Sequence, residues 1–303
     1  MSKEENKKES KIIKIKNDLI KAFDENSNSQ IDIEDVILKC MRIPGIKIDR
    51  GEFLRKEFSN KLSKEVIDKA IAENPMSAKI APEFIDKIAD NVIKFERIQV
   101  SGISAVLSAP GGLAAIATIP ADIAQYYGYL LRAMQKLLYL YGFPQLDLEY
   151  KGALLDSESM RVVVTCLGVM FGVGTANKIL HKLASALAEG LGKKITKTAV
   201  TKTVWYPALQ KICKFFSYSL TKTAFKEAIK KAMPVVGFVL GGTITYFSFG
   251  PCCNKLKLQL KDTIFSNPNY IEPIDDNIDS DEEITIELQA EDFEDISSNE
   301  AKK

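Results

Sequence analysis

The chain contains a single histidine, His181, and this scarcity limits the chemistry that the protein can carry. A zinc or iron site of the common kind needs a second histidine or a cluster of cysteines. The cysteines are instead odd in number and irregularly spaced: Cys40, Cys166, Cys213, Cys252 and Cys253. A histidine-dependent catalytic triad would have to use His181 alone, and no Gly-x-Ser-x-Gly motif accompanies it. We therefore expect no metal, no cofactor and no catalytic residue, and an enzyme is the less favoured class of protein.

Two glycine-rich segments lack the features of nucleotide-binding motifs. The segment Gly190-Leu191-Gly192-Lys193-Lys194 has no leading glycine at the spacing of a phosphate-binding loop, and Lys194 stands where that loop needs Ser or Thr. The segment from Gly168 to Gly174 does not match the dinucleotide-binding fingerprint. Nucleotide binding is therefore not expected.

Both ends of the chain are predicted to be disordered. Residues 1–9 carry charges of both signs and no apolar run, which argues against a secretory signal and favours a cytoplasmic protein with reduced thiols. We assign residues 1–11 to a disordered N-terminus. About thirteen acids and no base fall between Glu272 and Glu300, so residues 269–303 are predicted to form an acidic disordered tail. An N-terminal helical region at 12–76 and a helical core at 77–268 lie between these ends.

The predicted fold class is all-α, a multi-helix domain whose apolar helices are broken by glycine and proline and pack through small residues. Asp49 is placed to cap a helix from Arg50 to about Leu62, and Ser63 is placed to cap the next one. Pro82 suits the first turn of a long helix. The predicted apolar stripe of this helix consists of Phe84, Ile85, Ile88, Val92, Ile93 and Phe95.

Three stretches with little charge follow, at residues 98–121, 162–177 and 232–254. The first and third are long enough to cross a bilayer, but Pro110-Gly111-Gly112 interrupts the first, and glycines and prolines punctuate the third. We expect two short helices in 98–121 rather than one spanning helix. Core helices, spanning helices and a hairpin that inserts into a membrane surface all remain open for these stretches.

A polar stripe is predicted along the helix from Asp122 to Leu140. At 100° per residue its members fall on about a third of the helix circumference: Asp122, Gln125, Tyr126, Tyr129, Arg132 and Lys136. One interpretation is a stripe that lines a cleft or meets a lipid headgroup, with Arg132 and Lys136 suited to phosphate. The other is the solvated face of a core helix, with Asp122 as its N-cap.

Charge is distributed unevenly although the net charge is only +1. About twelve lysines and two acids fall between Lys178 and Lys231, among apolar and aromatic residues, which suits an anionic membrane surface. The candidate contacts to anionic headgroups are Lys193, Lys194, Lys197, Lys202, Lys211, Lys214 and Lys222. Nucleic acid is not expected as a partner, because this stretch has no arginine. An ordinary solvated lysine face is the alternative, and the acidic tail could fold back on the lysines.

Several motifs resemble those of the EcsC family. They are Ala109–Asp122, Gln125–Gly128, Leu131–Arg132, Gln135–Leu137, Tyr139–Gly142 and Ala232–Thr243. The resemblance covers about residues 40–265 and implies a cytoplasmic, mostly helical domain with membrane association. It implies no reaction and no catalytic residue, so the polar stripe is inferred from this chain alone.

Three hypotheses for the function follow. The favoured one is a non-enzymatic, peripheral membrane or lipid-interacting helical protein that uses a lysine-rich face and an apolar hairpin at the inner face of the membrane. The second is a soluble adaptor or regulator of a membrane protein such as a transporter. The third is an enzyme that uses Asp122 with neighbouring tyrosines and Arg132.

Overall fold

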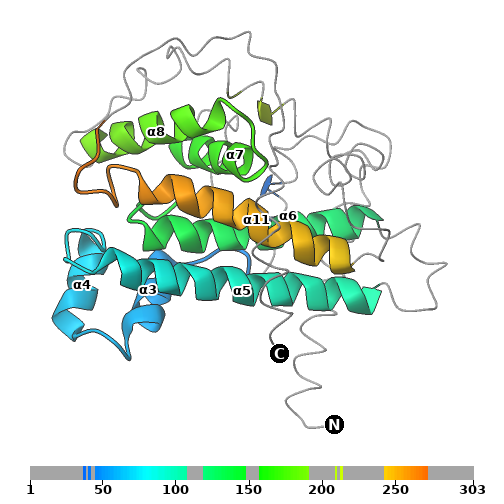
Figure 1. Ribbon diagram of the computed structural model, residues 1–303, viewed down its shortest axis with the longest axis horizontal. Helices are drawn as coiled ribbons and strands as arrows, with labels where there is room; N and C mark the ends of the chain where they lie inside the picture. Colours follow the sequence, from blue (N-terminus) through cyan, green and yellow to red (C-terminus); the bar gives the residue numbers. More distant parts are fainter. Residues whose placement is uncertain are drawn as a thin grey trace, which may run out of the picture.

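In the part of the chain that the structure describes, three long helices form the middle and four shorter helices pack around them (Figure 1). The computed structural model describes residues 37–38, 40–41, 45–107, 119–147, 157–190, 209, 212–213 and 242–271. Every element within these ranges is helical, which confirms the all-α fold class. The long helices are α5 (Pro82–Leu107), α6 (Ile119–Leu140) and α11 (Gly242–Lys261). The shorter ones are α3 (Arg50–Phe58), α4 (Lys64–Ala72), α7 (Glu158–Met170) and α8 (Ala176–Gly190).

The side-chain contacts fix the direction of each long helix. Asp86 of α5 contacts Tyr141 just after α6, and Glu96 of α5 contacts Arg132 of α6, so these two helices are antiparallel. The pairs Asp86–Lys261 (2.7 Å) and Asp90–Lys257 (2.5 Å) show that α11 is also antiparallel to α5. Because such partly exposed ion pairs contribute only about 0–1 kcal/mol each, they define the register more than they stabilise the fold.

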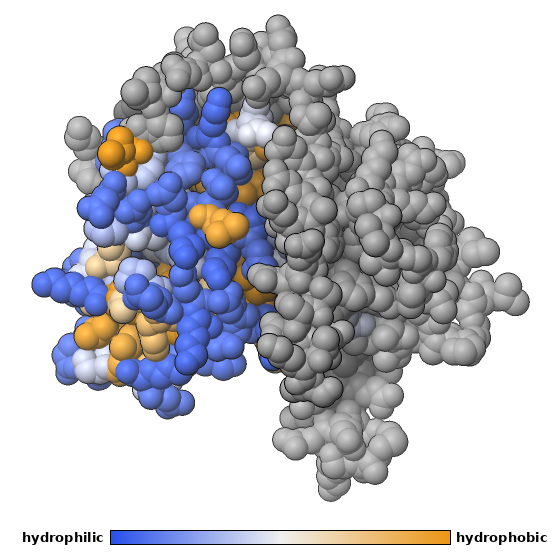
Figure 2. Space-filling model, viewed as in Figure 1, coloured by the Kyte–Doolittle hydropathy of each residue, from blue (hydrophilic) through white to orange (hydrophobic). Residues whose placement is uncertain are grey.

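Helix α6 is the centre of the core. From Tyr126 to Phe143 nearly every side chain is buried, and α3, α5, α7 and α11 all pack against this helix. Each leucine that is fully buried there contributes about 2 kcal/mol through apolar burial. The described part of the face in Figure 2 is, by contrast, mostly hydrophilic with small separate apolar patches. Among the described residues no helix is both long enough and apolar enough to cross a membrane.

The predicted start signals are found at α3, α4 and α5. Asp49 accepts a hydrogen bond from the Glu52 amide at 2.7 Å, and Ser63 accepts one from the Val66 amide at 3.5 Å. Helix α3 ends at Phe58, earlier than expected, because the chain turns there to reach the cap at Ser63. Pro82 is the first residue of α5, as predicted.

Three predictions about the helices were wrong. The apolar residues after Ile98 do not begin a separate short helix, since α5 continues unbroken to Leu107. Asp122 is not an N-cap, because α6 already begins at Ile119 and Pro120 fits its first turn. Pro251 does not interrupt α11, which runs through it. The neighbouring Gly250 leaves room for the Arg97 guanidinium, whose Nη1 would lie 3.4 Å from a Cβ at that position.

The apolar stripe of α5 was correct except at Phe95. Ile85, Ile88, Val92 and Ile93 are buried, but Phe95 is 50% exposed. Glu96 takes the core position instead, because it lies four residues after Val92 and therefore on the same side of the helix.

Candidate functional site: a buried charge cluster between α5 and α6

Glu96 is the centre of a charge cluster in the interface between α5 and α6. Its side chain is 0% exposed, and its Oε1 atom accepts hydrogen bonds from Lys136 Nζ at 2.5 Å and from Arg132 Nε at 3.1 Å. The other oxygen, Oε2, is buried and has no hydrogen-bond partner in the described part of the chain. One carboxylate oxygen therefore holds two cations while the second holds none.

Lys136 is enclosed by aromatic rings. Its Nζ lies 5.7 Å from the ring centroid of Phe53 on α3 and 5.7 Å from that of Phe95 on α5, within the range of a cation–π interaction. Burial lowers the pKa of Lys136, and the adjacent Glu96 carboxylate offsets part of this effect. Within the described residues, the lysine ammonium thus contacts one carboxylate and two aromatic rings.

Arg132 connects the cluster to the segment before α3. Its Nη1 donates to the Gly45 carbonyl at 2.9 Å, and its side chain remains 27% exposed, so the cluster meets the protein surface at this residue. One turn later, the Gln135 side chain donates to the Ile46 carbonyl at 2.9 Å and accepts from the Ile48 amide at 3.1 Å. Arg132 and Gln135 together fix residues 45–48 against α6.

The predicted polar stripe divides between two neighbours. Tyr129, Arg132 and Lys136 lie near Glu96 on the α5 side, and burial raises the pKa of the half-buried Tyr129. Tyr126 lies on the α11 side, fully buried, with its hydroxyl 3.1 Å from Ser248 Oγ and 4.0 Å from Cys252 Sγ. The stripe therefore packs between helices at these four positions, and neither a cleft nor a solvated face describes it.

The remaining site residues are not placed. Asp122 and Gln125 lie in the first turns of α6, where the structure describes the backbone only. All seven candidate lysines between Lys193 and Lys222 lie outside the described residues, as do residues 1–11 and 272–303. His181 is buried and stacks on Tyr270, with ring centroids 5.9 Å apart and planes at 4°. In the described part of the chain, His181 therefore serves to pack α8 against Tyr270.

The cluster limits what Arg132 and Lys136 can do chemically. Since Glu96 already accepts from both, a phosphate would have to displace this carboxylate or use only the outward-facing donors of Arg132. Within the described residues, no three histidine, cysteine, aspartate or glutamate side chains come together in a group that could hold a metal ion. The geometry there is that of a structural ion-pair network with one unsatisfied acceptor.

Sequence reasoning missed Glu96, although a signal was present. A carboxylate at a core position of the α5 stripe, followed four residues later by the buried Val100, indicates a buried charge that needs a cationic partner. Arg132 and Lys136, in the polar stripe of α6, are the cationic partners.

No protein-family model matches this chain, and neither a curated protein nor a solved structure is similar to it at a significant level. The resemblance to the EcsC family therefore stays a hypothesis that depends on the motifs in the sequence.

Proposed function

We propose that this chain is a non-enzymatic, EcsC-like helical protein that binds peripherally to anionic membranes. Lysines between Lys178 and Lys231 would meet the lipid headgroups, and the apolar glycine-rich segments would enter the membrane surface. The observation that carries this proposal is the position of three helix ends.

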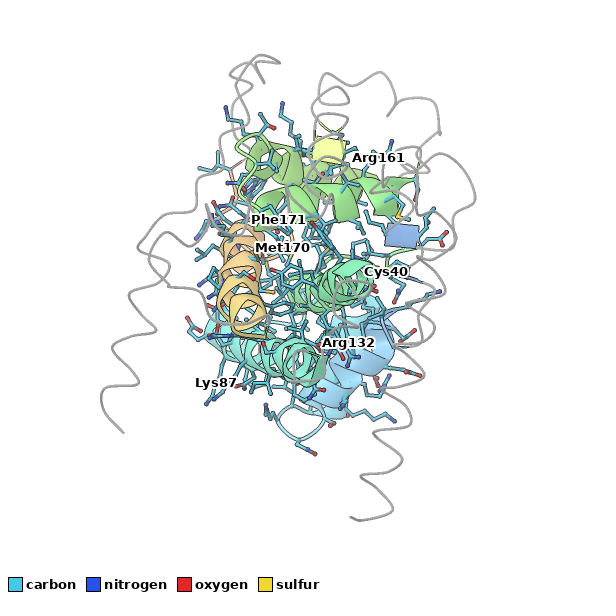
Figure 3. The ribbon with its side chains drawn as sticks, turned by 90° about the vertical axis from the view of Figure 1, so that its right-hand side faces the viewer. Cys40, Lys87, Arg132, Arg161, Met170 and Phe171 are labelled. Atoms are coloured by element: carbon cyan, nitrogen blue, oxygen red, sulfur yellow. The ribbon has the colours of Figure 1, made fainter. Side chains whose placement is uncertain are left out.

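Leu107 at the end of α5, Ile119 at the start of α6 and Gly242 at the start of α11 all lie at the same end of the three-helix layer. The antiparallel register of α5 with both other helices requires this arrangement, and Figures 1 and 3 agree with it. The apolar segments 108–118 and 232–241 are attached at these ends. Two segments that are far apart in the sequence thus start from one side of the molecule, as a common membrane contact requires.

Exposed apolar side chains on α5 support the same orientation. Phe95 and Ile98 are 50% and 51% exposed, and both lie in the half of α5 that leads to Leu107. An aromatic and an aliphatic side chain at this position suit the boundary between headgroups and acyl chains.

Vesicle co-sedimentation tests the proposal. We expect the protein to sediment with anionic vesicles more than with neutral ones, and raising the salt concentration about tenfold should weaken binding because exposed charges become screened. Replacing Lys193 and Lys194 by Gln should weaken binding by about fivefold per lysine, since each lysine near the surface contributes about 1 kcal/mol. The matched control replaces Lys56 and Lys69 by Gln. These lysines are exposed on α3 and α4, and their replacement should leave binding unchanged.

The apolar half of the proposal has its own variant. Leu113→Asp with Ile116→Asp places two charges in segment 108–118 and should reduce binding to both kinds of vesicle. Leu258→Asp, at a 59% exposed position of α11, is the control. Equal recovery with anionic and neutral vesicles, unaffected by salt and by the lysine exchanges, would reject the electrostatic contact and favour a soluble adaptor.

A further inference from the structure

After α11 the chain stays in contact with the helices as far as Tyr270. The Phe265 ring packs on the Phe143 ring at 4.9 Å between centroids, and Thr263 Oγ1 donates to the Leu260 carbonyl at 3.1 Å. The Asn267 side chain donates to Asp262 at 2.6 Å. These contacts direct the chain away from α11.

The end of this segment contacts α8. Tyr270 stacks on His181, and the Ser185 hydroxyl donates to the Tyr270 hydroxyl at 3.4 Å. The next residue, Ile271, is 85% exposed, so the chain leaves the protein surface at this point. The acidic tail predicted from the sequence therefore starts beside α8.

Two lysines of α8, Lys178 and Lys182, share the helix face that makes this contact. Lys178, His181, Lys182 and Ser185 follow the i, i+3, i+4, i+7 spacing of one helix face, and Lys178 is exposed while Lys182 is half-buried. The only acid of α8, Glu189, lies near its C-terminal end. His181 Nδ1 is moreover buried and has no hydrogen-bond partner in the described part of the chain.

The sequence after Ile271 has the charge and the length to cover this face. Acids at Glu272, Asp275, Asp276 and Asp279 follow directly, and no base occurs before Lys302. Eight extended residues span about 26 Å. The fifteen residues of α8 extend about 22 Å, so this first part of the tail can reach along the whole helix.

We propose that the acidic tail binds the Lys178–Lys182 face of α8 within the same molecule, with the stack of Tyr270 on His181 as its anchor. A short tether gives an effective concentration of about millimolar, which favours this contact over a separate acidic partner. Insofar as α8 belongs to the membrane-binding face, an inference that depends on the function proposed above, the tail competes with anionic lipid and inhibits binding.

Carbodiimide cross-linking of the full chain followed by peptide mass spectrometry tests the contact without any membrane. We expect amide links between Lys178 or Lys182 and carboxylates of residues 272–283 at low salt, within the monomer, and a loss of most of them at high salt. Tyr270→Ala should reduce these links severalfold, whereas Tyr270→Phe should keep most of them because the ring stack remains. The absence of such links in the wild-type monomer, or equal links in Tyr270→Ala, would overturn the proposal.

A second measurement separates this inference from the proposed function. In the full chain, exchanging Glu272, Asp275, Asp276 and Asp279 for their amides should raise binding to anionic vesicles severalfold. Lys87→Glu, on the exposed side of α5 away from α8, is the charge control and should not alter the cross-links (Figure 3). Cross-links without vesicle binding by either form would remove the membrane function and leave the docked tail. Vesicle binding without cross-links would reject the docked tail and leave the membrane function in place.

Discussion

Arg50 and Glu96 are both charged, both buried and both adjacent to α6, but the protein satisfies them differently. Arg50 donates to four backbone carbonyls: Phe143 at 3.0 Å, Ile71 at 2.5 Å, Ala70 at 3.1 Å and Glu73 at 3.1 Å. Three of these belong to the C-terminal end of α4, where the helix dipole favours a cation. Glu96 instead relies on two cationic side chains, and its second oxygen has no hydrogen-bond partner among the described residues.

The two sites therefore differ in how rigidly their partners are held. The partners of Arg50 are main-chain atoms of two segments, the C-terminal end of α4 and the turn after α6, and these atoms cannot shift without moving the backbone of those segments. The partners of Glu96 are long side chains, and Arg132 reaches the surface. We infer that the Arg50 site sets the geometry of α3, α4 and the loop after α6, whereas the Glu96 site tolerates rearrangement of its cations.

The largest expected effect is that of Arg50→Met. The substitution leaves four buried or partly buried carbonyls without a donor, so the free energy of unfolding should fall by about 3–5 kcal/mol. Urea denaturation would measure it. Arg55→Met is the control, because Arg55 forms an exposed pair with Asp68 at 2.9 Å and should cost no more than about 1 kcal/mol. Similar costs for the two variants would contradict the comparison.

Glu96→Gln should come next. It leaves Lys136 buried without a counter-charge, while Arg132 can turn toward water, so we expect a loss of about 2–4 kcal/mol. Combining Glu96→Gln with Lys136→Met removes both charges and should recover part of that loss, and a double-mutant cycle with the two single variants would quantify the recovery. If the double variant is no more stable than Glu96→Gln, the pairing of Glu96 with Lys136 does not explain the cost.

Gly142→Ala tests the turn after α6, in which the Phe143 carbonyl accepts a hydrogen bond from Arg50. Gly142 has φ +94°, and a Cβ there would lie 2.9 Å from the Phe265 carbonyl oxygen. Backbone strain and this close contact should together cost about 1–3 kcal/mol and should loosen the Phe143 carbonyl from Arg50. Gly174→Ala is the matched control, since nothing lies within 4 Å of its added Cβ. Thermal unfolding of both variants provides the measurement.

The smallest expected effect is a difference in pH dependence. Burial raises the pKa of Tyr139, a neighbour of Arg50, to about 12. The folded protein then keeps a proton that the unfolded chain loses above about pH 10, so stability falls between pH 10 and 12, by up to about 2 kcal/mol. Tyr139→Phe should make this fall shallower.

Lys136 should contribute to the pH dependence of stability with the opposite sign. Its pKa is lowered by burial, so the unfolded chain holds a proton that the folded protein has released, and stability gains from rising pH until about pH 10.5. Lys136→Met should remove this gain and make the alkaline loss of stability steeper. Urea unfolding at a series of pH values distinguishes the two variants, and identical profiles would contradict both assignments.

The sequence predicted local features well because they depend on local physics. Asp49, Ser63 and Pro82 start helices through contacts within a few residues, and the period of α5 correctly identified most of its buried side. The polar stripe of α6 was harder. Periodicity groups Tyr126, Arg132 and Lys136 on one side of a helix, but it does not reveal whether water or another helix covers that side. The covering residue, Glu96, comes from a different helix.

The pairing of α5 with α11 has a consequence for the order of folding. Asp90 and Lys257 are 167 residues apart in the sequence, whereas Glu96 and Arg132 are only 36 apart. During synthesis at about 5–20 residues per second, α5 meets α6 within seconds but waits about 10–30 s for α11. Until then the sides of α5 and α6 that α11 will cover, including Tyr126, stay open to solvent and to other chains. A nascent chain stalled before Gly242 should therefore bind chaperones that the complete protein no longer needs.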